Sequence, residues 1–306
     1  MSTPIKEQSV STEDTQSSEE QLVEPKENAA VTQKETNKRN QLYLVVGDKG
    51  GVGKTTFALG LVEGLLERNV SPANISVADG DPVRPLLKIK IGQFNTWLSM
   101  TKPELKEMNY SDRQFGNQDN VVADRYSGDR VGESPNVITT EFLSYIMPNN
   151  SEGTQHHVIV NMPSGSNGLI NLAKDYWKEL LNEAGYDLNV FWLLWPQIET
   201  EHGIDDSLES GIMSVATRNY AVYPRHLRSD PKEFDWQGPR STNSTVNTLV
   251  MPGVVAPLAW SEYLALPGFY TTHAQSISII NSAAFSLGWY KPTIRELNGV
   301  FEELSA

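Results

Sequence analysis

The sequence of 306 residues contains no cysteine. This absence excludes disulfide bonds, zinc sites built from thiolates and thiol nucleophiles. Basic residues are also scarce, because 25 Lys and Arg stand against 38 Asp and Glu and leave a formal net charge of −13. This balance argues against a protein that covers DNA or anionic lipid, since both are bound by clustered Lys and Arg.

Long hydrophobic runs are missing as well. The longest, such as residues 190–195, have the length of a strand and fall far below the roughly 20 residues that a bilayer span needs. Residues 1–6 begin no apolar segment of the length found in signal peptides. The sequence therefore predicts a cytoplasmic protein with no membrane partner.

Residues 1–40 differ in composition from the rest of the chain. They contain no glycine and no aromatic residue, and consist mainly of Ser, Thr, Glu, Gln and Lys. Such a segment cannot bury enough apolar surface to offset the entropy lost on ordering. We therefore predict a disordered polar tail over residues 1–40 and one domain over 41–306. A tail that docks on a partner is the alternative.

Within residues 41–306, apolar runs of strand length alternate with helical patterns. Runs that are apolar on both faces fit the interior strands of a parallel sheet. Strands are expected at residues 42–46, 75–78, 158–160, 190–194, 221–223 and 249–251. Helices are expected at residues 56–68, 169–183 and 273–289. The alternation predicts an α/β fold with a mainly parallel central sheet flanked by helices.

Two stretches of this domain lack a clear period. Residues 92–154 are polar, rich in Asn, Asp and Gly, and residues 230–244 contain Pro231, Gly238 and Pro239. We interpret both as loop-rich insertions. His156 and His157 directly precede a predicted strand and are expected at a solvated strand entry, not in a metal site.

The most informative segment is residues 47–56, with the sequence GDKGGVGKTT. It follows a predicted strand and opens a predicted helix, which is the context that a phosphate-binding loop requires. Glycines allow positive φ and bring backbone N–H groups onto phosphate oxygens, and the helix N-terminus adds partial positive charge. Lys54 is placed to reach the β- and γ-phosphates, and the Thr55 hydroxyl to ligate Mg²⁺.

A second lysine, Lys49, stands just before the glycine pair, in the order x-K-G-G-x-G-K-[ST]. Here the sequence resembles the deviant Walker A family of ATPases, which includes ParA, MinD and the nitrogenase iron protein. The resemblance implies a three-layer P-loop NTPase fold that binds ATP and Mg²⁺. It also implies an ATP-dependent homodimer in which Lys49 crosses to the partner's nucleotide. The residues that it assigns to nucleotide binding are Gly50, Gly51, Val52, Gly53, Lys54, Thr55 and Thr56.

Two further segments support the same resemblance. Residues 75–82 are similar to the family's second strand, which ends in D-x-D-P; by this match Asp81 orients the attacking water and Asp79 lies near the Mg²⁺ shell. The structural alternative is that both carboxylates only end a strand and cap a helix. Residues 158–165 resemble the Walker B strand and its D-x-P-x-G switch, but Asn161 stands in place of the Asp. An amide can accept a hydrogen bond from a Mg²⁺-bound water yet brings no negative charge.

The resemblance implies a catalytic set of Lys49, Lys54 and Asp81, and a metal set of Thr55, Asp79 and Asn161. The implied activity is ATP hydrolysis by a dimeric switch that positions or partitions a cargo through a protein partner or cargo adaptor. Two alternatives stay open. Asn161 favours a slowly hydrolysing nucleotide-binding adaptor, and residues 92–154 as a substrate lid would fit a P-loop kinase or synthetase of small molecules.

The charges of two segments bear on whether the protein binds anionic lipid or DNA. Residues 293–304 carry an apolar stripe beside an acidic polar face, which anionic lipid would repel, so a helix docked on the domain is expected. The basic residues between Arg218 and Lys232 leave weak, non-specific DNA binding by a dimer open, although a solvated charged face is the simpler interpretation.

Overall fold

The computed structural model describes residues 38–47, 49–80, 85–111, 134–147, 154–197, 203–241, 243–254 and 256–305. Asn37–Ala306 form one compact unit, and every element named below belongs to it. The tail predicted for residues 1–40 lies outside the described residues up to residue 37, so its disorder stays a prediction.

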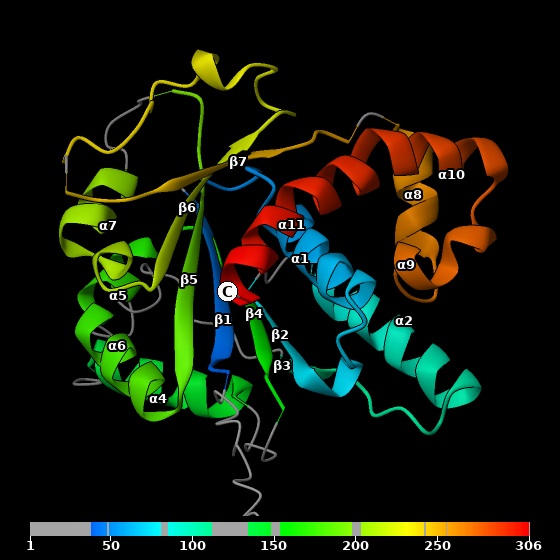
Figure 1. Ribbon diagram of the computed structural model, residues 1–306, viewed down its shortest axis with the longest axis horizontal. Helices are drawn as coiled ribbons and strands as arrows, with labels where there is room; N and C mark the ends of the chain where they lie inside the picture. Colours follow the sequence, from blue (N-terminus) through cyan, green and yellow to red (C-terminus); the bar gives the residue numbers. More distant parts are fainter. Residues whose placement is uncertain are drawn as a thin grey trace, which may run out of the picture. The chain divides into compact units, whose positions relative to one another are not determined.

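The described residues contain a sheet of seven parallel strands in the order β3-β2-β4-β1-β5-β6-β7 (Figure 1). The strands are β1 (Asn40–Gly47), β2 (Ile75–Asp79), β3 (Asn109–Ser111), β4 (His157–Asn161), β5 (Tyr186–Leu193), β6 (Arg218–Pro224) and β7 (Asn247–Met251). The central strands are buried along almost their whole length, as their unbroken apolar runs predicted. The predicted α/β fold with a parallel sheet is confirmed.

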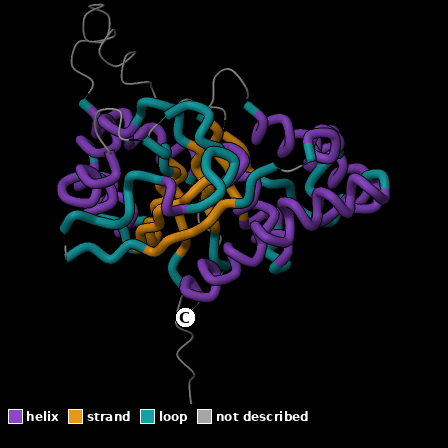
Figure 2. The backbone as a smooth tube through the Cα atoms, turned by 90° about the horizontal axis from the view of Figure 1, so that it is seen from above, coloured by secondary structure: helices purple, strands orange, loops and turns teal. Residues whose placement is uncertain are grey.

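Helices cover both faces of this sheet, which gives three layers (Figures 1 and 2). One layer consists of α1 (Lys54–Glu67), α2 (Leu86–Thr101), α8 (Pro257–Ala265), α9 (Tyr270–His273), α10 (Ile279–Phe285), the π-helical turn η5 (Ser286–Tyr290) and α11 (Lys291–Ser305). The other consists of α4 (Pro135–Ile146), α5 (Asn167–Leu172), α6 (Lys174–Glu183) and α7 (Gly203–Ser210). Short 3₁₀ turns lie at η1 (Pro72–Asn74), η2 (Ile212–Ser214), η3 (Pro231–Glu233) and η4 (Ala274–Ser276).

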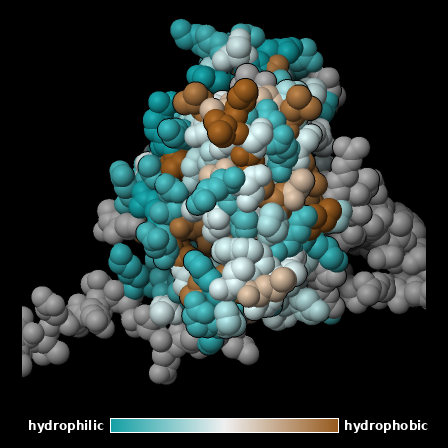
Figure 3. All heavy atoms as spheres, turned by 90° about the vertical axis from the view of Figure 1, so that its right-hand side faces the viewer, coloured by the Kyte–Doolittle hydropathy of each residue, from teal (hydrophilic) through white to brown (hydrophobic). Residues whose placement is uncertain are grey.

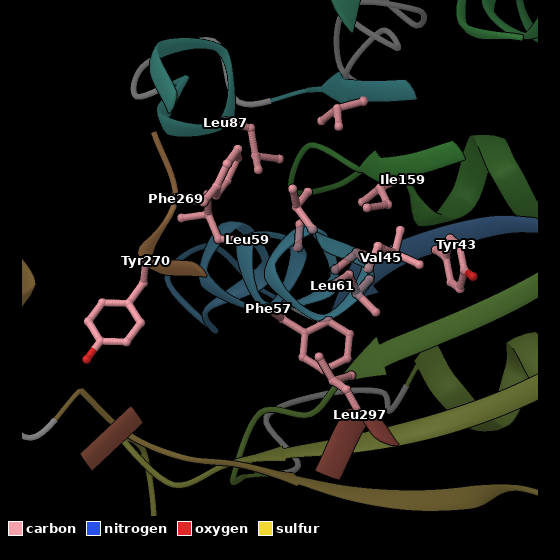
Figure 4. Close-up of a cluster of buried hydrophobic side chains, with 14 of the residues drawn as sticks. Tyr43, Val45, Phe57, Leu59, Leu61, Leu87, Ile159, Phe269, Tyr270 and Leu297 are labelled. Carbon is pink, nitrogen blue, oxygen red and sulfur yellow. The ribbon is translucent and has the colours of Figure 1, made fainter. Parts of the chain in front are cut away.

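Each face of the sheet has its own hydrophobic core. On the α1 side, Val45 and Ile159 of the sheet lie beside Leu61 of α1 (Figure 4). On the α6 side, Trp192 of β5 and Trp177 of α6 are fully buried. Burying one such side chain contributes roughly 1.5–3 kcal/mol, so the two cores account for why the sheet stays between its helices.

The last helix, α11, packs directly on α1. A Cβ atom added to Gly60 would lie 2.8 Å from Thr293 Cγ2, and one added to Gly64 would lie 2.6 Å from Phe301 Cε2. The predicted docking of residues 293–304 is therefore confirmed: Leu297 and Phe301 are buried in the α1-side core. Glycine at both α1 positions permits this close approach.

The segment that forms α8–α10 is poor in charged residues and exposes several apolar side chains. Residues 263–290 contain no Asp, Glu, Lys or Arg. Their aromatic side chains pack inward, with Tyr263 and Phe285 stacked at 4.5 Å between ring centroids. Ile279, Ile280 and Leu287 are exposed, and Figure 3, which faces this side, shows hydrophobic residues scattered among hydrophilic ones.

Three secondary-structure predictions were wrong in detail. The single helix expected at 169–183 is two helices, α5 and α6, that meet at Ala173. The helix expected at 273–289 is broken, because Ile277 and Ser278 adopt non-helical backbone angles and bury Ile277. Residues 92–154 hold, besides the end of α2 and helix α4, the short strand β3, which the sequence did not indicate.

The two histidines are also placed differently from the expectation. His156 and His157 are buried, and the Tyr43 hydroxyl lies 2.8 Å from His157 Nδ1. Burial, and to a smaller extent the neighbouring His156, lower the pKa of His157 to about 4. The strand entry is therefore a buried polar contact and not a solvated one.

The described residues of 230–244 are mostly irregular, and some of them are buried. Phe234 and Trp236 are buried on the α6 side of the sheet. No helix of the described residues is both long and apolar enough to cross a bilayer.

Candidate functional site

Parallel strands bring their carboxyl ends to one edge of the sheet, and three neighbouring strands, β2, β4 and β1, do so here. In this register Asp79 at the end of β2 lies opposite Asn161 at the end of β4. Gly47 ends β1, and its carbonyl accepts a 3.2 Å hydrogen bond from Asn167 Nδ2 in α5. The segments that the sequence pattern singled out therefore converge at one place.

The glycine-rich loop leads from β1 into α1. Gly51 has φ 79° and Gly53, the N-cap of α1, has φ 96°, both in the left-handed region that favours glycine. Val52 is fully buried, and a Cβ on Gly47 would lie 2.9 Å from its Cγ2 atom. The side chain of Val52 thus packs in the core, and only its backbone could contact a ligand.

Lys54 is the first residue of α1 and is only 8% exposed. Its Nζ donates to the Lys49 carbonyl at 3.3 Å and to Ser164 Oγ at 3.1 Å. The ammonium group therefore lies within the curve of the loop, between Lys49 and the segment that follows β4. A cation in this position, at the N-terminus of a helix, is suited to an anionic ligand.

Thr55, Asp79 and Asn161 form a second polar group beside the loop. Asn161 Nδ2 donates to Thr55 Oγ1 at 3.1 Å and to Asp79 Oδ1 at 2.8 Å. Asp79 Oδ2 accepts from the backbone N–H of Leu87 at 3.2 Å, so it also caps α2. The structural role weighed for Asp79 is therefore present, together with its place at the loop.

The donor atoms of this group suit a hard divalent cation. They are a hydroxyl, a carboxylate and an amide carbonyl, and Asn161 Oδ1 is buried with no hydrogen-bond partner in the described part of the chain. A cation bound with a polyphosphate needs few protein ligands, because the phosphates supply oxygens. In the described part of the chain, no three His, Asp or Glu side chains gather as a metal cluster.

The loop carries further predicted site residues. Lys49 is half-buried, with its Nζ 5.2 Å from the centre of the Trp195 ring. Asp81 lies outside the described residues, so its predicted role in orienting water stays a prediction. Gly50 is exposed on the loop and Thr56 is half-buried in the first turn of α1.

Three residues at the loop were not predicted from the sequence. Ser164 contacts Lys54, Trp195 contacts Lys49, and His226 Nε2 lies 3.3 Å from the Gly51 carbonyl. A Cβ on Gly53 would lie 2.9 Å from His226 Cε1, so the imidazole rests on the loop. Ser164 lies in the switch-like segment that was recognised, whereas only the strand order brings Trp195 and His226 to the site.

Comparison with known proteins identifies few relatives. No protein-family model matches the chain. No curated protein matches it either. Ten chains of solved structures do. One is a nucleotide-binding protein from Archaeoglobus fulgidus in complex with ADP, with cobalt found in it. The match covers 74% of this chain and 87% of that chain, with 14% identity and a TM-score of 0.42. A likeness this weak carries no argument about ligand or activity.

Proposed function

We propose that this protein is an ATPase of the ParA/MinD type, which binds ATP with Mg²⁺ at the carboxyl edge of β1, β2 and β4. One observation carries the proposal: Lys54 Nζ lies inside a loop that ends in the left-handed N-cap Gly53, beside the Thr55–Asn161–Asp79 group. A cation, a helix N-terminus and clustered oxygen donors are the features that a metal–polyphosphate ligand needs.

Each residue has a separate role in this proposal. The loop N–H groups and Lys54 hold the phosphates, and Thr55, Asp79 and Asn161 hold Mg²⁺. Mg²⁺, when bound, neutralises charge on the phosphate oxygens. Asp81 orients the attacking water, and Lys49 leaves its own loop to reach the nucleotide of a partner subunit in an ATP-dependent homodimer. These last two roles rest on the family resemblance.

The cellular task follows from the same resemblance. A dimer that closes on ATP and opens after hydrolysis changes the surface it offers to a partner. We infer that this surface recruits a protein partner or cargo adaptor, and that the cargo is a plasmid, a mobile element or a cellular complex. The net charge of −13 favours a protein partner over DNA.

A second candidate is a nucleotide-binding adaptor that hydrolyses ATP slowly. Asn161 supports it, because the amide occupies the position between Thr55 and Asp79 where a carboxylate would add charge for the cation. Asp79 is then the sole carboxylate among the three predicted metal ligands. Weaker attraction for Mg²⁺ would slow turnover while leaving nucleotide binding intact.

Nucleotide binding is tested by titrating the protein with ATP and Mg²⁺ in a calorimeter. Lys54→Ala should weaken binding roughly a hundredfold, since a hydrogen bond from a charged group to an anion contributes about 1.5–3 kcal/mol. Lys174→Ala removes a lysine that pairs with Asp175 on α6 and should bind as the wild type does. Equal affinities for all three proteins would refute the site.

Two further measurements separate the candidates. Light scattering after gel filtration should show a dimer with ATP that Lys49→Ala abolishes; a dimer unchanged by this substitution would refute the role of Lys49. Steady-state turnover should rise in Asn161→Asp if the protein is a slow adaptor. Turnover that is fast in the wild type and unchanged in the variant would exclude the adaptor.

A further inference from the structure

The turn after β4 places one hydroxyl group inside the glycine-rich loop. Pro163 rests against Gly80 at the end of β2, and Ser166 Oγ donates to the Pro163 carbonyl at 2.9 Å. Asn167, which begins α5, binds the Gly47 carbonyl at the base of the loop. The turn is therefore anchored on both sides, and Ser164 projects from its middle.

Ser164 Oγ lies between two parts of the loop. It accepts the 3.1 Å hydrogen bond from Lys54 Nζ, and a Cβ added to Gly50 would lie 3.4 Å from it. A hydroxyl that accepts one hydrogen bond still has its own hydrogen to donate. Among the described residues none accepts that hydrogen, and Ser164 is exposed, so a ligand in the loop can reach it.

The position of Gly50 indicates which phosphate this hydroxyl would meet. Gly53, the N-cap of α1, marks the helix end of the loop, and the backbone N–H groups of such a loop hold the α- and β-phosphates of a nucleotide. Gly50 lies three positions earlier, toward the strand end, and Lys54 is the residue that reaches the β- and γ-phosphates. Ser164 is in contact with Lys54 on the side of Gly50, where the outermost phosphate would lie.

We propose that Ser164 binds the terminal phosphate of a nucleoside triphosphate, and that its hydroxyl lets the site distinguish a triphosphate from a diphosphate. The inference rests on the proposed nucleotide binding and adds to it a residue that the loop motif does not contain. In the structure Lys54 donates to Ser164; with a triphosphate bound, Lys54 and Ser164 would both donate to its terminal oxygens.

The test compares two ligands across four proteins. Dissociation constants are measured by calorimetry for a non-hydrolysable ATP analogue and for ADP, each with Mg²⁺. In Ser164→Ala the analogue should bind roughly tenfold or more weakly, since the lost hydrogen bond goes to a charged group, while ADP binding stays within about twofold. Ser164→Thr keeps the hydroxyl and should retain most of the preference for the analogue.

Ser166→Ala is the matched control, because it removes a hydroxyl from the same turn that faces the Pro163 carbonyl and not the loop. It should keep the wild-type preference. Ser164 is exposed, so Ser164→Ala should unfold at the wild-type temperature.

Three outcomes overturn the inference. Equal weakening of the analogue and ADP would mean that Ser164 does not touch the terminal phosphate. Tighter binding of both ligands in Ser164→Ala would mean that the hydroxyl only competes for Lys54. A wild-type protein that binds neither ligand would refute the proposed function itself, and this result differs from the other two.

Discussion

Two regions on the α1 side of the sheet contain buried polar side chains, and they differ in how these side chains are hydrogen-bonded. Where α8 and α9 meet α1 and α2, Glu63 is fully buried and accepts hydrogen bonds from the Tyr270 N–H and from the N–H and hydroxyl of Thr271. Lys90, also buried, donates to the carbonyls of Tyr263, Leu266 and Gly268. Beside the glycine-rich loop, by contrast, Asn161 keeps a buried oxygen that no described residue hydrogen-bonds.

The difference separates a structural polar group from the candidate ligand site. Burial raises the pKa of Glu63 and lowers the pKa of Lys90 to about 8, while their mutual attraction opposes the shift of Lys90. Three acceptors for one ammonium group leave it nothing to offer a ligand. The loop region instead combines an unsatisfied oxygen with Thr55 and Asp79 within hydrogen-bond distance of the same side chain. Both groups are buried; the charges of Glu63 and Lys90 are hydrogen-bonded by the protein itself, whereas Asn161 Oδ1 has no such bond among the described residues.

The largest expected loss of stability comes from a substitution in the structural region, at Glu63. Glu63→Ala removes the acceptor of three hydrogen bonds and leaves Lys90 buried without the opposing charge, which costs about 3–5 kcal/mol. Denaturant unfolding followed by circular dichroism measures this loss. Glu67→Ala, one turn along α1 and exposed, is the control and should cost about 1 kcal/mol or less. Equal costs for the two variants would contradict the structural role of Glu63.

A second prediction concerns how stability depends on pH through His157, which begins β4, the strand that ends in Asn161. Because the pKa of His157 is about 4 in the folded protein and about 6.5 when unfolded, the unfolded chain binds the extra proton as the pH falls between these values. The free energy of unfolding should therefore drop by about 3 kcal/mol from pH 7 to pH 4, and this contribution should level off below pH 4. His157→Gln should flatten this part of the profile; an unchanged slope would exclude His157 as its source.

The third prediction tests the candidate metal ligands. Asn161→Asp replaces the amide donor 2.8 Å from Asp79 by a second carboxylate, so the protein without metal should lose about 1–3 kcal/mol of unfolding free energy. Millimolar Mg²⁺ should restore stability, since a cation between the carboxylates offsets their repulsion.

Asn189→Asp is the matched control for this substitution. Asn189 is buried in β5, and among the described residues its carbonyl oxygen also lacks a partner, while its amide contacts Gln41 and the Leu42 carbonyl but no carboxylate. The control should be destabilised and not rescued. If Mg²⁺ rescues both variants equally, or neither, the metal assignment at Asn161 is wrong.

The smallest expected effect concerns Lys49. Its contact with the Trp195 ring should contribute about 0.5–1 kcal/mol, the range for partly exposed cation–π pairs. A double-mutant cycle of Lys49→Ala and Trp195→Leu on the free energy of unfolding isolates this coupling from the packing of Trp195. Strictly additive costs would show that the contact stabilises nothing.

Most of the sheet could be predicted from the sequence, because strands buried on both faces leave unbroken apolar runs such as residues 42–46 and 190–194. β3 could not, since it is three residues long and mostly polar. The break at Ile277 and Ser278 was missed because apolar residues continue on both sides of it, and only tertiary packing buries Ile277.

Some residues of the candidate site could likewise be predicted from the sequence, and others could not. Local pattern indicated Lys54, Thr55 and the glycines, since a strand, a loop and a helix are adjacent in sequence. The contacts of Lys54 with Ser164 and of Thr55 with Asn161 join residues more than a hundred positions apart. The strand order β2-β4-β1 creates them, and no single segment contains that order.

The packing of α11 on α1 has a consequence for synthesis on the ribosome. Gly64 and Phe301 touch although they are more than two hundred positions apart, so the face of α1 that bears Gly60 and Gly64 stays uncovered until the last helix has emerged. Contacts this distant in sequence form late and slowly. The helix that begins at Lys54 therefore reaches its final packing only after α11 has been translated, and the glycine-rich loop at its N-terminus stays attached to an incompletely packed helix until then.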